Sequence, residues 1–224
     1  MQIKFIAQSG FIIELSNGKR LGIDIWLKNP LHPMAMDDVP KMDYVFVTHD
    51  HGDHDMKSCI EIAKRDSAWF TSCYEIATYA SSQGVLNVES GNVGGSYKMG
   101  KDLEVIQTLA HHSSDTGRPV GFIIRTSEGT IYHMGDTGYF SELKFYSELY
   151  KIDTLMIPIG SRYTMDALQA SYAVADLKPK IVIPMHYNTF PKIQQDPNLF
   201  AEYVRERGVE TNVRVMEPGE TINV

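Results

Sequence analysis

The chain has 224 residues, enough to bury a sizeable hydrophobic core, and its 21 basic and 28 acidic residues give a net charge of −7. An acidic balance provides no electrostatic surface for nucleic acid or for an anionic membrane, so neither is an expected partner. The first residues lack a long apolar run, and no later run spans a bilayer, so we expect a soluble cytoplasmic protein. Cys59 and Cys73 have no CxxC neighbour and are expected as reduced thiols rather than as a disulfide.

Apolar periodicity divides the chain into expected strands and helices. The strands cover residues 2–7, 10–16, 20–25, 44–48, 102–109, 121–126, 130–134, 154–159, 181–185 and 212–216. The helices cover 55–65, 73–82, 141–150, 165–177 and 198–207, with Gly84 and Gly208 just after two of them and Thr164 as a candidate N-cap. Segments 28–40 and 87–100 are rich in Pro or Gly and are expected as loops at a pocket entrance. No linker divides the chain, so we expect one domain over residues 1–224.

Two parts of the chain repeat the same order of features. A hairpin pattern that starts at Gly10 leads to Asp24, and a similar hairpin that starts at Gly121 leads to Asp136. An apolar strand follows each acid, and the paired features lie about 110 residues apart. The pattern predicts two similar β-rich halves that face each other with functional residues at a shared edge. Coincidence among common hairpin patterns is the alternative.

Residues 48–54 read Thr-His-Asp-His-Gly-Asp-His and place four ligand-type side chains directly after an apolar strand: His49, His51, Asp53 and His54. Imidazole nitrogen and carboxylate oxygen are ligands for zinc and similar divalent ions. In an extended loop, residues 49, 51 and 53 point to one side and His54 points elsewhere, so one motif can serve two ions. A solvated polar loop is the alternative, which a lone HxH pair would favour but this spacing does not.

Together with three later elements, this motif resembles the hallmark of the metallo-β-lactamase fold superfamily. The elements are His112 in Ala110-His111-His112-Ser113-Ser114, Asp136 in Met134-Gly135-Asp136-Thr137 and His186 in Pro184-Met185-His186-Tyr187. Nearly the whole chain is similar to a group of small metal-dependent hydrolases related to L-ascorbate-6-phosphate lactonase. The resemblance implies a mixed α/β (α+β) fold, a four-layer αββα sandwich.

The resemblance also implies a dinuclear metal centre with seven protein ligands. His49, His51 and His112 would hold one ion, Asp53, His54 and His186 the second, and Asp136 would bridge both. Zinc is the expected metal, and ligand type alone also allows manganese, iron or nickel. A hydroxide between the ions is the expected nucleophile, with Asp53 and Asp136 as the catalytic carboxylates. Asp24 is expected to support a ligand histidine from behind.

Neighbouring residues need separate assignments. His112 is chosen over His111 because the His-Ser-Ser segment matches the family, and His133 on an apolar strand is expected as a packed, hydrogen-bonded residue. Gln8 stands where many of the similar proteins carry His, which leaves the role of that position open.

Substrate recognition is expected in the segment Gly160-Ser161-Arg162-Tyr163-Thr164, which occupies the place of the metal motif in the second half. Arg162 and Tyr163 are candidates to bind a phosphate or carboxylate, and a structural salt bridge of Arg162 is the alternative. The expected function is hydrolysis of a small ester, lactone or phosphorylated metabolite. A phosphodiesterase with the same two-metal site, or a non-catalytic metal-binding or redox sensor, are the alternatives. The sequence leaves the oligomeric state open, homo-oligomers included.

Overall fold

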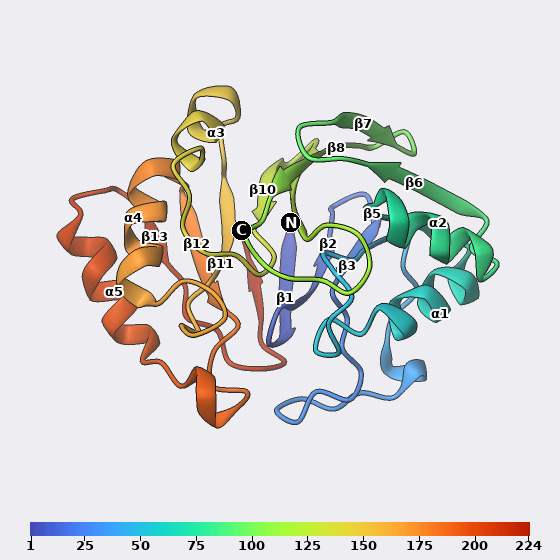
Figure 1. Ribbon diagram of the computed structural model, residues 1–224, viewed down its shortest axis with the longest axis horizontal. Coiled ribbons are helices and arrows are strands. Elements are labelled where there is room, and N and C mark those ends of the chain that lie inside the picture. Colours follow the sequence, from blue (N-terminus) through green and yellow to red (C-terminus); the bar gives the residue numbers. More distant parts are fainter.

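The computed structural model describes residues 1–224 and arranges them in four layers, with two sheets packed face to face and helices on both outer faces (Figure 1). The predicted αββα sandwich is confirmed. None of the helices combines the length and the apolar character that crossing a bilayer requires. Cys59 and Cys73 are both free and buried.

The first sheet has seven strands and carries two helices. In spatial order the strands are β14 (Thr221–Asn223), β1 (Gln2–Ala7), β2 (Gly10–Glu14), β3 (Arg20–Ile23), β4 (Tyr44–Phe46), β5 (Trp69–Cys73) and β6 (Asn87–Gly91). The helices on its outer face are α1 (Met56–Asp66) and α2 (Tyr74–Ser82). A short 3-10 helix, η1 (Met36–Asp38), lies in the connection between β3 and β4.

The second sheet also has seven strands and carries three helices. In spatial order the strands are β13 (Asn212–Val213), β12 (Ile181–Met185), β11 (Thr154–Pro158), β10 (Gly129–His133), β9 (Val120–Thr126), β8 (Leu103–Leu109) and β7 (Ser96–Met99). The helices are α3 (Leu143–Leu149), α4 (Ala167–Leu177) and α5 (Pro197–Glu206), and the 3-10 helix η2 (Pro191–Ile193) follows β12.

Burial on both faces explains the strongly apolar strands of the second sheet. On β11, Leu155 and Ile157 pack in the cluster beneath α3, α4 and α5, whereas Met156 packs in the larger cluster that both sheets share. Successive side chains of a strand point to opposite faces, so a strand covered on both sides is apolar along its whole length. All five residues of β11 are accordingly buried.

The internal repeat predicted from the sequence is present in the topology. In each sheet, antiparallel neighbours are followed by parallel ones: β1, β2 and β3 and then β4, β5 and β6 in the first, and β8, β9 and β10 and then β11, β12 and β13 in the second. The edge strands β14 and β7 complete the match. Consequently β4, which precedes the His-rich motif, and β11, which precedes Gly160, occupy equivalent places.

Four strands escaped the sequence-based prediction: β5, β6, β7 and β14. In β5, Thr71 and Ser72 interrupt the apolar pattern although both are buried; the Thr71 hydroxyl lies 2.6 Å from the Tyr97 hydroxyl, and Ser72 donates to the Val47 carbonyl oxygen at 2.7 Å. Segment 87–100 is not a loop, because it contains β6 and β7. The short β14 pairs with β1 from the opposite end of the chain, a contact that no local pattern predicts.

Helix ends agree with the sequence except at α4. Gly84 and Gly208 adopt left-handed backbone angles, φ +93° and +68°, directly after the C-caps of α2 and α5, as predicted. The predicted N-cap Thr164 is wrong. Asp166 caps α4 instead, and its carboxylate accepts a hydrogen bond from the Gln169 N–H.

Candidate metal centre

The candidate site residues follow the carboxyl ends of strands that run in the same direction within each sheet. In chain order, Asp24 follows β3, His49, His51, Asp53 and His54 follow β4, His112 follows β8, Asp136 follows β10, Arg162 and Tyr163 follow β11, and His186 follows β12. Such strand ends meet at one edge of a sheet, and here the edges of both sheets lie together. Segments that are far apart in the sequence therefore contribute to one site.

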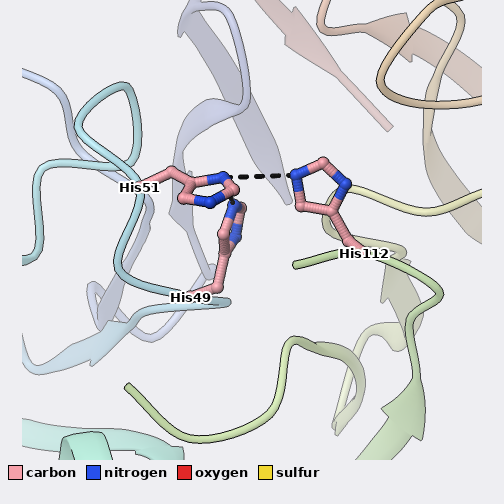
Figure 2. Close-up of side chains that lie close together, drawn as sticks. All are labelled: His49, His51 and His112. Atoms are coloured by element: carbon pink, nitrogen blue, oxygen red, sulfur yellow. Dashed lines mark hydrogen bonds between the residues drawn. The ribbon is translucent and has the colours of Figure 1, made fainter. Parts of the chain in front are cut away.

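Three histidines converge in what we call the three-histidine group, His49, His51 and His112 (Figure 2). His51 Nδ1 lies 3.0 Å from His49 Nε2 and 3.2 Å from His112 Nε2. The loop after β4 of the first sheet and the loop after β8 of the second thus bring three imidazole nitrogens close together, an arrangement suited to a divalent cation. His111 lies outside this group, because its side chain is exposed and its ring packs against Phe140.

A second set of ligand-type side chains, the mixed group, comprises Asp53, His54, Asp136 and His186, whose ligand atoms all lie within 4.8 Å of one another. Asp136 Oδ2 is 2.9 Å from His186 Nε2 and 3.3 Å from His54 Nε2. The same oxygen is 3.6 Å from His112 Nε2 and 4.0 Å from His49 Nε2. Asp136 therefore lies between the two groups.

Asp24 lies behind the mixed group and orients one of its rings. Its fully buried carboxylate accepts from His54 Nδ1 at 2.8 Å, from the Thr48 hydroxyl at 2.7 Å and from the Thr48 N–H at 2.9 Å. A carboxylate on one ring nitrogen fixes the tautomer and leaves the other nitrogen to act as a ligand. His54 Nε2 is consequently directed toward Asp136.

Burial and charge act differently on the two groups. Burial lowers the pKa of His49 and of His112 in the three-histidine group. In the mixed group burial acts in the same direction, but nearby carboxylates outweigh it. Asp136, with Asp53, raises the pKa of His186 to about 9, and Asp136, with Asp24, raises that of His54 well above its usual value. Burial alone would raise the pKa of Asp136, yet the neighbouring His186 and His54 hold it well below its usual range.

The residues of the site fit a metal ion. Asp136 Oδ1 and His54 Nε2 are buried and have no hydrogen-bond partner, which is unusual for buried polar atoms. They belong to a cluster of five imidazoles and two carboxylates, ligand types that zinc and related ions accept. By contrast, His133 has its partners within the protein, since Nε2 donates to the Ser9 carbonyl oxygen at 2.9 Å and Nδ1 accepts from the Gly135 N–H at 3.2 Å. His133 is thus a packed, hydrogen-bonded residue, as predicted.

Unusual backbone angles gather around the mixed group. Gln8, Asp24 and His186 have φ values of 56°, 45° and 57°. Residues other than glycine rarely adopt such angles, and those that do cluster at functional sites. The Gln8 carbonyl oxygen accepts from the His186 N–H at 2.8 Å, and Gln8 Nε2 donates to Asp53 Oδ2 at 2.8 Å. Gln8, whose role the sequence left open, therefore contacts two residues of the mixed group. Gly160 lies so close to the His186 carbonyl oxygen that a Cβ would collide with it, a contact that the sequence did not predict.

Comparison with known proteins agrees with this geometry. A family model described as a Beta-lactamase superfamily domain matches residues 2–186. The chain belongs to this superfamily. UPF0173 metal-dependent hydrolases from Caldivirga maquilingensis and Staphylothermus marinus are 42% and 44% identical to it, with 99% and 98% of this chain and 97% of each relative covered. Igni18, a metallo hydrolase from Ignicoccus hospitalis, is 40% identical with a TM-score of 0.90, covering 99% of this chain and 98% of that chain. The protein is a metal-dependent hydrolase.

In this member of the β-lactamase superfamily, a cavity of about 780 Å³ opens over both ligand groups, and five group residues line it: His51, Asp53, His112, Asp136 and His186. Tyr163 also lines the cavity. Arg162 does not line it; its side chain is exposed, and its guanidinium lies 5.6 Å from the centre of the Tyr163 ring. Segments 28–40 and 87–100 contribute no lining residue, contrary to expectation. Trp26 and residues 190–193 line the cavity instead.

The two adjacent histidines provide a matched test of the ligand assignment. His112→Ala is expected to reduce metal content and to lower kcat/KM by about 10²-fold or more, because a bound ion contributes several kcal/mol of transition-state stabilisation. His111→Ala removes the same atoms from an exposed position and should change kcat/KM by no more than about twofold. Elemental analysis and initial rates on samples shown to be folded by circular dichroism measure both effects. The reverse order of effects would show that His111 is the ligand.

Proposed function

We propose that this hydrolase uses two divalent metal ions, with zinc as the expected metal, to cleave small esters, lactones or phosphorylated metabolites. The three-histidine group would hold one ion and the mixed group the other.

The position of Asp136 is the observation that carries the proposal. Its Oδ2 atom lies 2.9 Å from His186 in the mixed group and 3.6 Å from His112 in the three-histidine group. A carboxylate that reaches both sets of imidazoles is suited to bridge two cations that lie side by side. The cavity above the groups supports a catalytic role over a sensor role, because it gives a small molecule access to the ligand atoms.

When bound, a pair of divalent ions supplies a water activated near neutral pH and stabilises the negative charge that develops on the substrate. The residues of the chain contribute the remaining functions. Asp53 lines the cavity and is held by Gln8 Nε2, so it is suited to orient the attacking water and to accept its proton. Asp24 and Thr48 keep the His54 ring in place. Tyr163 would contact the substrate, and Arg162, beside its ring, would attract an anionic substrate group.

A reconstitution screen tests the proposal. The protein is stripped of metal with a chelator, reloaded separately with zinc, manganese, iron or nickel, and assayed on panels of esters, lactones and phosphate mono- and diesters. Turnover of an ester, lactone or phosphomonoester that disappears on stripping and returns on reloading supports the proposal. Turnover of diesters alone would replace it with a phosphodiesterase, and metal binding without turnover on any panel would support a sensor.

Metal uptake is expected to depend on pH in one group more than in the other. In the metal-free protein His186, with a pKa of about 9, and His54 are protonated at neutral pH and must lose a proton before they bind a cation. His49 and His112 have lowered pKa values and are already neutral. At a fixed, chelator-buffered free zinc concentration, bound zinc should therefore rise from about one toward two ions per chain between pH 6 and pH 9. Equilibrium dialysis measures it, and uptake independent of pH would contradict this assignment.

A further inference from the structure

We propose that one wall of the cavity is a subsite for an uncharged apolar group of the substrate, alkyl or aryl, attached next to the bond that is cleaved. This inference rests on the proposed hydrolysis in the same cavity and specifies its substrate further. The apolar wall, as we call it, consists of Trp26, Tyr163, Phe190, Pro191 and Ile193.

The apolar wall joins residues from both halves of the fold. Trp26 follows β3 of the first sheet, and Phe190 follows β12 of the second, yet their ring centroids are 6.0 Å apart with the planes inclined by 37°. Rings at this separation attract each other and hold the wall together. Phe190 remains 39% exposed and Trp26 is partly exposed, so an apolar group in the cavity would remove further apolar surface from water.

The segment that carries Phe190 is held rigidly close to the mixed group. The Asn188 N–H donates to the Ile193 carbonyl oxygen at 2.9 Å, and Asn188 Oδ1 accepts from the Gln195 N–H at 2.9 Å. Ile193 is only 1% exposed and anchors the segment, and its own N–H donates to the Phe190 carbonyl oxygen at 3.0 Å. His186, a residue of the mixed group, stands at the start of this segment. A wall ordered in advance loses little conformational entropy when a ligand binds.

Charge is distributed unevenly around the cavity. The ligand groups supply the polar side, whereas Lys192 is the one Lys or Arg residue among the lining residues, and it is exposed. A substrate that places its carbonyl or phosphoryl group at the ligand groups would place its remaining part against the apolar wall. Hydroxyl groups buried against that wall would lose their hydrogen bonds to water, which is unfavourable. The geometry thus favours an apolar substituent at this wall.

A chain-length series with one leaving group tests the subsite. The zinc-loaded enzyme is assayed on p-nitrophenyl acetate, butyrate and hexanoate, with each rate divided by that of hydroxide-catalysed hydrolysis. kcat/KM should rise by about fourfold per added methylene. Phe190→Ala and Trp26→Ala should abolish most of this increase. Phe145→Ala makes the same change as Phe190→Ala on α3, at a residue that is 59% exposed and outside the cavity, and should leave the increase unchanged.

A binding experiment without turnover provides a second readout. The chain has two tryptophans, so in Trp69→Phe the tryptophan fluorescence, excited selectively over that of tyrosine, comes from Trp26 alone. Titration of the metal-stripped protein with acetamide, butyramide and hexanamide should shift this fluorescence, with Kd falling by about fifteenfold for each two methylenes. Adding Phe190→Ala should weaken hexanamide binding to the level of acetamide. If Trp69→Phe fails to fold, the wild-type protein is compared with Trp26→Phe. The wild-type fluorescence should respond to the amides, and the Trp69 fluorescence of Trp26→Phe should not.

The outcomes separate the subsite from the proposed function. Metal-dependent ester hydrolysis with no dependence on chain length, or with the same dependence in Phe190→Ala as in Phe145→Ala, overturns the subsite and leaves the hydrolase proposal standing. Loss of all turnover on every panel overturns the hydrolase proposal, while the amide titration still decides the subsite. Equal Kd values for the three amides would overturn the subsite.

Discussion

Asp136→Asn is expected to remove part of the bound metal and to lower kcat/KM by about 10³-fold or more, because a bound ion contributes several kcal/mol of transition-state stabilisation. The amide has the shape of the carboxylate but lacks its charge, and Asp136 Oδ2 is the atom that lies close to imidazoles of both groups. Elemental analysis and initial rates on a substrate from the reconstitution screen measure the two losses.

The control for this substitution is Asp176→Asn, the same chemical change on α4, where the carboxylate accepts only from the Tyr139 hydroxyl. It should keep its metal and its activity. Asp136→Asn also leaves His54 and His186 without their main counter-charge, and removing one partner of a buried pair costs about 3–5 kcal/mol of stability. Metal content is therefore compared at a temperature at which both variants are folded. An Asp136→Asn protein with full metal content and activity would disprove a bridging role.

The second large effect concerns metal stoichiometry. The metal-saturated protein is expected to bind two divalent ions per chain, and the double variant His54→Ala/His186→Ala is expected to bind one. Removing two imidazoles from the mixed group leaves the three nitrogens of the three-histidine group intact, and three ligands suffice for a zinc site. Elemental analysis against protein concentration gives the ratio.

The reciprocal variant His49→Ala/His112→Ala is the matched comparison and should also bind one ion, now in the mixed group. The two double variants then distinguish a dinuclear centre from a single ion with alternative ligands. If the wild-type protein saturates with one ion, and loss of His54 and His186 leaves that ion in place, the dinuclear proposal is wrong.

Much of the candidate centre was predictable because its chemistry is concentrated in short motifs. His49, His51, Asp53 and His54 lie within one loop, so their number and spacing alone indicated a metal. The remaining ligand candidates came from resemblance to a family, and the structure brings them to the same place. The ten predicted strands and five helices overlap elements of the structure because their apolar periodicity reflects burial against a sheet or a helix layer.

Prediction failed where a feature depends on partners distant in the sequence. In β5, the buried hydroxyls of Thr71 and Ser72 find their hydrogen-bond partners at Tyr97 and Val47, and β14 exists because it pairs with β1. Arg162 and Tyr163 are adjacent in the sequence, yet Tyr163 lines the cavity and Arg162 does not. The backbone is left-handed at Ser161 and Arg162, with φ values of 59° and 49°, which no local pattern predicts.

The sequence by itself determined the types of candidate ligand, the order of the two β-rich halves and the strands with a continuous apolar pattern, since these follow from side-chain chemistry and local periodicity. Tertiary structure decided which candidate ligands share a group, that Asp136 lies close to both groups and that Gln8 holds Asp53. It also decided the apolar wall, because Trp26 and Phe190 meet only when the two sheets pack. Local patterns specify what a residue can bind, whereas distances between segments exist only in the packed fold.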